Sequence, residues 1–184
     1  MRRSKNIHPR FLFLTVAVIL GLLLSHTRFS ATAQDTTEQE DLSAILEGAY
    51  AVERVVDGDT LYIINDTGKS EKIRLIGIDT PESVHAEESK NTEEGLIASD
   101  FTKALLSDTQ VWLEYDVDRY DQYGRTLAYV YVEEGDNLVM VQDQLLYHGL
   151  AQTMTIQPNS KYATRFVEIQ REAQQAGRGF WANS

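Results

Sequence analysis

Acidic and arginine side chains are concentrated in three short segments of this sequence. The segments are Asp57-Gly58-Asp59-Thr60, Arg74-Leu75-Ile76-Gly77-Ile78-Asp79-Thr80-Pro81-Glu82 and Tyr123-Gly124-Arg125. Carboxylates can bind a hard cation or accept a proton, and guanidinium groups bind anionic oxygens with paired N–H donors. Together the segments pair several acids with two arginines, each in or beside a predicted strand.

Composition restricts which chemistry these segments can perform. The chain has no cysteine and only four histidines, of which His8 and His26 fall in the N-terminal segment. These counts exclude a disulfide scaffold, a thiol nucleophile and a cysteine-based zinc site. A metal site built from histidines, or a Ser-His-Asp triad, is also hard to assemble. Any chemistry must therefore use carboxylates, arginines, hydroxyls and a metal ion.

Each segment taken alone also has a purely structural interpretation. An Asp-Gly pair between strands, such as Asp57-Gly58, is usually a hairpin turn. The run from Asp79 to Glu82 could cap the helix that follows it, and Arg74 could lie on the outer face of a strand. Only the combination of the three segments favours a functional site.

Two other motifs fail on spacing. Gly68-Lys69-Ser70 ends like a phosphate-binding P-loop, but Ile63 stands where that motif requires glycine. The acidic run that begins at Asp116 resembles the start of a calcium-binding loop, but its sixth position is Asp121 and its twelfth is Leu127. We interpret the first as a hairpin turn and the second as a solvated connection.

Short β-rich segments and three helical segments predict the fold. The expected strands cover about residues 50–56, 60–65, 72–78, 111–115 and 127–132. Helices are expected from about Thr92 to Leu106, from Val141 to just before Gly149, and from about Tyr162 to Gln175, on the spacing of their apolar residues. This order predicts an α+β protein, a five-stranded Greek-key barrel of the OB type with three helices.

The first 33 residues have the features of a secretory signal peptide. A cationic start is followed by an apolar run from Phe11 to Leu24 and by Ala31-Thr32-Ala33, a suitable cleavage site. The alternative is an uncleaved N-terminal anchor, although the run is short for a membrane span. We expect an acidic, flexible spacer over residues 34–47 and a single domain over residues 48–184. Without residues 1–33, which hold five of the 17 bases and none of the 28 acids, the net charge would be −16.

The three segments, in this order and spacing, resemble the signatures of the staphylococcal nuclease (thermonuclease) family. They read DGDT (residues 57–60), RLIGIDTPE (74–82) and YGRTLAYVY (123–131). The tail is similar too: Gly149-Leu150-Ala151, Pro158-Asn159 and Gly179-Phe180-Trp181 follow in the family's order. The resemblance extends from about Tyr50 to Trp181 and implies an exported, Ca²⁺-dependent nuclease.

The resemblance also implies roles for the acidic residues. Asp59 and Asp79 would be carboxylate ligands of Ca²⁺, and Thr80 would add its backbone carbonyl. Asp57 would sit just outside the metal and hold a metal-bound water. Two aspartates and a carbonyl are the oxygen ligands that a hard cation favours, and water can complete the coordination.

By the same resemblance, Arg74 and Arg125 would grip the scissile phosphate and Glu82 would activate or position the attacking water. Tyr123 would contact the substrate, and the products would end in 3′-phosphate. Two guanidinium groups suit the negative charge that builds up on the phosphate during attack, and lysine could not reproduce their fork geometry. The expected substrate is DNA or RNA, with single strands preferred, and the protein is expected to act as a secreted or surface-exposed monomer.

A non-catalytic OB-type module that binds nucleic acid or another polyanion is the alternative hypothesis. Some features of the substrate-binding periphery depart from the best-known family members: the segment 83–94 is acidic, Gln122 replaces a lysine, and Thr155 and Gln157 occupy the region of two nucleotide-flanking tyrosines. The predicted catalytic set is complete, so these departures concern affinity and substrate preference rather than the reaction.

Overall fold

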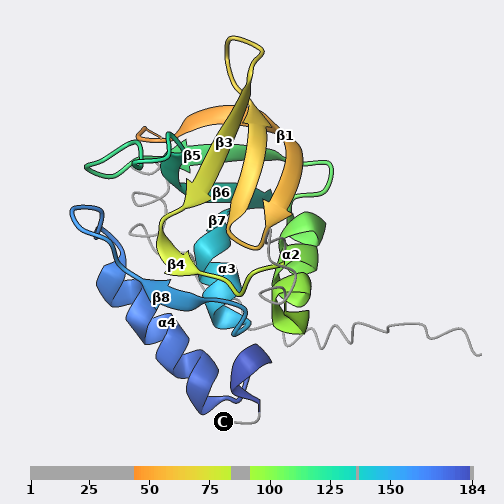
Figure 1. The fold of residues 1–184 in the computed structure, drawn as a ribbon, viewed down its shortest axis with the longest axis vertical. Helices are drawn as coiled ribbons and strands as arrows, with labels where there is room; N and C mark the ends of the chain where they lie inside the picture. Colours follow the sequence, from red (N-terminus) through yellow and green to blue (C-terminus); the bar gives the residue numbers. More distant parts are fainter. Residues whose placement is uncertain (1–43, 84–91, 136, 183–184) are drawn as a thin grey trace, which may run out of the picture.

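A computed structural model describes residues 44–83, 92–135 and 137–182 of the chain, and Figure 1 shows its fold. The expected signal peptide, most of the acidic spacer and most of the acidic loop after Ser83 lie outside these residues. Five strands form a barrel: β1 (Glu47–Asp57), β2 (Thr60–Ile64), β3 (Ser70–Leu75), β5 (Gln110–Glu114) and β6 (Thr126–Glu134).

Pairing between β3 and β6 closes the barrel. The strand order is β3-β2-β1-β5-β6, and all of these neighbours are antiparallel. β3 then runs parallel to β6, with Arg74 opposite Leu127. A further strand, β7 (Asn137–Met140), extends the sheet beyond β6. The predicted α+β class and five-stranded OB-type barrel are therefore confirmed.

Alternating side chains explain why β2 and β3 form one wall of the barrel. Leu61, Ile63 and Ile73 point into the core and are at most 1% exposed. Their neighbours Tyr62 and Lys72 lie on the outer face and stay partly accessible. β6 differs because α3 packs against it, so its residues from Ala128 to Val132 are all buried. This explains why β6 reads as apolar throughout rather than as an alternating strand.

The strand expected over residues 72–78 is divided in two. β3 ends at Leu75, and β4 (Gly77–Asp79) leaves the barrel to pair antiparallel with β8 (Gln152–Met154). Gly77 has φ of 84°, and a Cβ there would lie 2.5 Å from the Phe166 ring. The break therefore requires glycine, both for its backbone angle and for the close approach of Phe166.

Three helices are present in the described residues, as expected. They are α2 (Glu93–Leu105), α3 (Val141–Tyr147) and α4 (Ala163–Gln175), followed by the short 3₁₀ helix η2 (Gly179–Trp181). In Figure 1, α2 lies beside β1, and α3 and α4 lie at the end of the barrel near β4 and β8. None of the helices in the described ranges is long and apolar enough to cross a membrane.

Candidate active site

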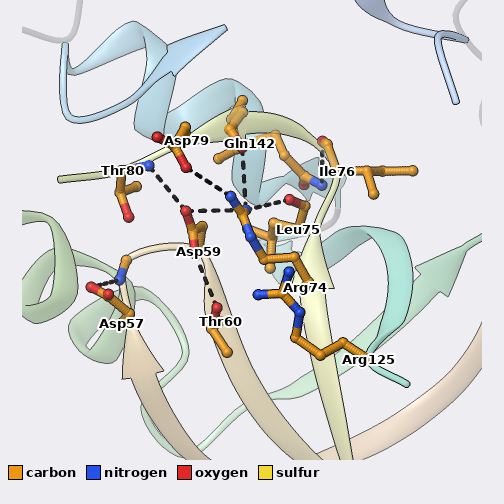
Figure 2. A network of polar contacts seen from close by, with 12 residues as sticks. Asp57, Asp59, Thr60, Arg74, Leu75, Ile76, Asp79, Thr80, Arg125 and Gln142 are labelled. Carbon is orange, nitrogen blue, oxygen red and sulfur yellow. Dashed lines mark hydrogen bonds and ion pairs between the residues drawn. The ribbon is translucent and has the colours of Figure 1, made fainter. Parts of the chain in front are cut away.

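Arg74 is at the centre of a buried polar network at the end of β3 (Figure 2). It lies on the outward face of the strand, but the β4 segment covers it and only 7% of the residue is exposed. Its guanidinium forms ion pairs with Asp59 at 3.0 Å and with Asp79 at 2.9 Å. It also donates to the carbonyls of Leu75 at 2.6 Å and Ile78 at 3.2 Å. Four acceptors therefore fix its position before any ligand binds.

The turn between β1 and β2 supplies two buried aspartates to this network. Asp59 accepts hydrogen bonds from the Thr60 hydroxyl and from the Thr80 backbone N–H, both at 3.0 Å. Asp57 points to the other side of the turn, where it accepts from the Ser83 hydroxyl at 2.7 Å and from the Gly58 N–H at 2.8 Å. The two aspartates thus attach the turn to both ends of the segment that follows β4.

Asp79 is the most accessible acid of the network, with 55% of its side chain exposed. Partial burial raises its pKa above the usual range. The charge of Arg74 opposes this rise, and the carboxylates of Asp59 and Asp57 add to it. Negative charge is therefore in excess here, because two carboxylates share one guanidinium at an accessible edge. A bound cation would relieve that excess.

The donor set at this edge fits a calcium ion. No group of three or more His, Cys, Asp or Glu side chains converges on a possible metal position within the described residues. A metal here would therefore depend on the carboxylates of Asp59 and Asp79, the carbonyl of Thr80, and oxygens from water or substrate. The Thr80 hydroxyl is buried and has no hydrogen-bond partner in the described part of the chain. Oxygen-only ligands with places for water suit Ca²⁺.

Arg125 approaches the same site from β6. In the parallel pairing of β3 and β6, Arg74 is opposite Leu127, so Arg125 lies two residues before that pair, and Figure 2 shows its guanidinium near that of Arg74. The Nε of Arg125 forms a 2.6 Å ion pair with Asp121. Burial acts to raise the pKa of Asp121, but hydrogen bonds from Arg125 and from the Tyr123 N–H lower it below the usual range. Asp121 therefore stays ionised and holds Arg125 in place.

A pocket of about 350 Å³ opens next to the two arginines. Its lining includes Arg74, Arg125, Tyr120, Tyr123, Ile156 and Gln157. Tyr123 is 76% exposed at the rim. Gln157 lines the pocket as expected for the nucleotide-flanking region, but Thr155 does not. Met154 and Ile156, on either side of Thr155, line it as well.

Helix α2 braces the segments that carry the acids. The Thr92 N–H donates to the Glu82 carbonyl at 2.9 Å, and the Thr102 hydroxyl donates to the Gly58 carbonyl at 2.8 Å. A Cβ at Gly95 would lie 2.2 Å from the Glu82 carbonyl oxygen, so the first turn of α2 packs directly on this backbone. The sequence analysis missed Thr102 and Gly95. A glycine inside a helix was the available signal, since it usually has a packing reason.

The predicted residues therefore fall into three groups. Asp59, Arg74, Asp79 and Thr80 are in direct contact, and Asp57 lies in the same turn as Asp59 but bonds to Gly58 and Ser83. Arg125 and Tyr123 line the pocket with Arg74. Glu82 lies two residues beyond Thr80, with an exposed side chain and a backbone fixed by α2.

Comparisons with known proteins agree with this arrangement. A family model described as "Staphylococcal nuclease homologue" matches residues 72–183. The thermonuclease of Staphylococcus hyicus is 38% identical over 168 residues, which cover 91% of this chain and 95% of that protein. The thermonuclease of Staphylococcus intermedius is 37% identical, covering 96% of this chain and 98% of its own length. Endonuclease YncB of Bacillus subtilis is 37% identical over 72% of this chain and 61% of its own. The chain belongs to the staphylococcal nuclease homologue family.

Proposed function

We propose that this protein is an exported, Ca²⁺-dependent nuclease that hydrolyses phosphodiester bonds of DNA or RNA. The observation that carries the proposal is the meeting of Arg74 and Arg125 in one pocket, beside the carboxylates of Asp59 and Asp79. Two guanidinium groups next to a cation site can bind one phosphate from two sides. The relatives named as thermonucleases cover nearly the whole chain and support the same reaction.

The arginines bind the scissile phosphate and stabilise its developing charge. Four acceptors already hold Arg74, so little reorganisation is needed when the charge appears. The ion pair of Arg125 with Asp121 uses Nε and so keeps the terminal nitrogens for the phosphate. When Ca²⁺ is bound, it supplies positive charge that neutralises and orients the phosphate. Asp59, Asp79 and the Thr80 carbonyl would hold it, and Asp57 would hold water beside it.

Glu82 accepts a proton from the attacking water or orients that water. The residue is exposed and its backbone is fixed by Thr92 and Gly95, so that its position relative to the site is defined. The water oxygen bonds to phosphorus, the P–O5′ bond breaks, and the leaving oxygen takes a proton from solvent. The products end in 3′-phosphate and 5′-hydroxyl.

Export, substrate preference and assembly complete the proposal. The cationic start, the apolar run and the Ala31-Thr32-Ala33 site favour cleavage before Gln34, which N-terminal sequencing of the secreted protein would show. An intact Met1 terminus in a membrane fraction would instead indicate an anchor.

We propose that the enzyme acts as a monomer and prefers single strands, because an open pocket beside two arginines is most accessible to unpaired nucleotides.

A digestion assay tests the reaction. Matched single-stranded DNA and RNA oligonucleotides are incubated with the protein in Ca²⁺, in Mg²⁺ and in excess chelator, and the ends of the products are analysed. We expect cleavage in Ca²⁺ with 3′-phosphate ends, and none in chelator. Binding without cleavage under every condition would favour the non-catalytic binding module, and full activity in chelator would exclude a metal-dependent mechanism.

A further inference from the structure

We propose that the outer face of β1, β2 and β3 carries a second contact site for the substrate, at which a single strand's phosphates bind outside the active site. This strip consists of Arg54, Tyr62 and Lys72 and is called the Arg54–Lys72 strip below. The proposal rests on the proposed nuclease function and extends it to how the enzyme holds a long strand.

The strip is a cross-strand row that leads away from Arg74. Arg54 lies opposite Tyr62 in the β1–β2 pairing, and Tyr62 lies opposite Lys72 in the β2–β3 pairing. Side chains two apart on a strand share a face and are about 7 Å apart. Lys72 and Arg74 are therefore neighbours on the outer face of β3. A strand whose phosphate is bound by Arg74 can place its next phosphates along this row.

The strip carries positive charge that is not paired with acidic side chains of the described residues, although the protein as a whole has an excess of acids. Neither Arg54 nor Lys72 forms an ion pair with a carboxylate of the described residues. By contrast, Arg74, Arg119, Arg125 and Lys161 each form one. The nearby Glu53 side chain accepts from the Ser70 hydroxyl. With a net charge of −16 after residue 33, an unpaired pair of cations gives a local surface that complements a polyanion.

Tyr62 keeps Arg54 in place. The Arg54 guanidinium carbon lies 3.8 Å from the centre of the Tyr62 ring, and the Lys72 Nζ lies 5.9 Å from it. A stacked guanidinium loses less conformational entropy when it binds a phosphate than a mobile one does. Tyr62 is therefore a positioning residue, and its ring edge remains partly accessible.

The strip compensates for the altered periphery of the pocket. Gln122 lines the pocket at a position where the family resemblance implies a lysine. The two cations of the strip add two phosphate contacts outside the pocket. Each contact adds about 0.7 to the slope of log affinity against log salt for a single strand. The contribution of the strip should therefore be absent for substrates too short to reach from the pocket to β1.

Binding measured without cleavage tests the strip. We would follow fluorescence anisotropy of a labelled 20-nucleotide oligothymidylate and of a labelled dinucleotide with a single phosphate, in chelator, with the wild type and with Arg54→Gln/Lys72→Gln. At about 0.1 M salt the double variant should bind the long strand about tenfold more weakly, and its salt slope should fall by about 1.4. Affinity for the dinucleotide should change less than twofold. Tyr62→Ala should weaken long-strand binding, and Tyr62→Phe should restore it.

A matched control removes the same charge elsewhere. Lys103→Gln/Arg171→Gln changes one cation on α2 and one on α4, both exposed, and should leave both affinities unchanged. Three results would contradict the proposal. They are equal binding of the long strand by the wild type and Arg54→Gln/Lys72→Gln, no binding of the long strand by the wild type, and equal losses of affinity for both lengths. Failure of the nuclease proposal is distinct, because it would appear as absence of cleavage in Ca²⁺ whatever the binding shows.

Discussion

Two polar clusters of this barrel contain buried acidic residues, and they are built differently. At the first, Asp59 and Asp79 share the guanidinium of Arg74, and Asp79 reaches solvent. At the second, Glu114 is 2% exposed and accepts from the Tyr131 hydroxyl at 2.7 Å, from the Tyr162 hydroxyl at 2.9 Å and from Lys161.

The difference lies in the balance between donors and acceptors. Glu114 accepts from three donors, all from the protein, and the cation Lys161 balances its charge. Burial, with the hydrogen bonds to Tyr162 and Glu114, raises the pKa of Tyr131, which therefore stays protonated as a donor. Around Arg74 the carboxylates exceed the cations. A buried acid with its own partners is structural, whereas an unbalanced group at an opening indicates a binding site.

The largest effect on the reaction is expected at Glu82, on the rim of the unbalanced cluster. Glu82→Gln keeps the shape of the side chain but cannot accept a proton, so turnover should fall about 10²–10⁴-fold. Initial rates on single-stranded DNA in Ca²⁺ measure this. Thermal unfolding measured beside the rates checks that the variant keeps the fold, because the Glu82 backbone packs on α2. A near-normal rate in a folded variant would show that Glu82 takes no part in the reaction.

A loss of stability without loss of chemistry is expected at Glu114. Glu114→Ala removes the acceptor shared by two tyrosine hydroxyls and Lys161, leaving Tyr131 only its hydrogen bond to Tyr162, and the free energy of unfolding should fall by about 3 kcal/mol. Urea denaturation measures this, with Glu114→Gln as the control that keeps one acceptor oxygen and should cost less. Activity per folded molecule should stay at the wild-type level. If turnover fell with Glu114→Gln while stability did not, the second cluster would have a part in catalysis.

The smallest effect is expected at Asp121, whose carboxylate holds Arg125. Asp121→Asn keeps an acceptor for the backbone N–H groups but loses the ion pair, which should cost about 0.5–1 kcal/mol, or roughly two- to fivefold in kcat/KM. The lowered pKa of Asp121 means that its contribution is complete above the usual aspartate range and is lost only as the pH falls through the lower folded value. The pH profiles of kcat/KM for wild type and variant should therefore run parallel above about pH 5. Profiles that diverge there would show that Asp121 titrates during the reaction.

The sequence predicted the barrel because its strands show either alternation or a continuous apolar run. It did not predict β4 and β8, since three-residue strands are too short to show any period. The division after Leu75 depends on the contact of Gly77 with Phe166, which is a tertiary contact between distant segments. The same limit applies to the segment at and after β8, where only the fold shows that Met154, Ile156 and Gln157 line the pocket.

The site could be anticipated where residue type carries the chemistry, as for Arg74 and the aspartates around it. Its supports could not, because their types are ordinary and only the fold assigns them a partner. Gln142 is fully buried and bonds to the Ala128 carbonyl at 3.0 Å and to the Val130 N–H at 3.2 Å, beside the point where β3 ends. Thr102 supports the β1–β2 turn in the same way. Neither position shows its role in a local pattern.

The parallel contact between β3 and β6 also determines when activity can arise. Arg74 and Arg125 come from segments far apart in the chain, and only closure of the barrel brings them together. Contacts of long sequence separation require loop closure and form slowly compared with local ones. Until β6 has paired with β3, the chain therefore lacks the paired arginines.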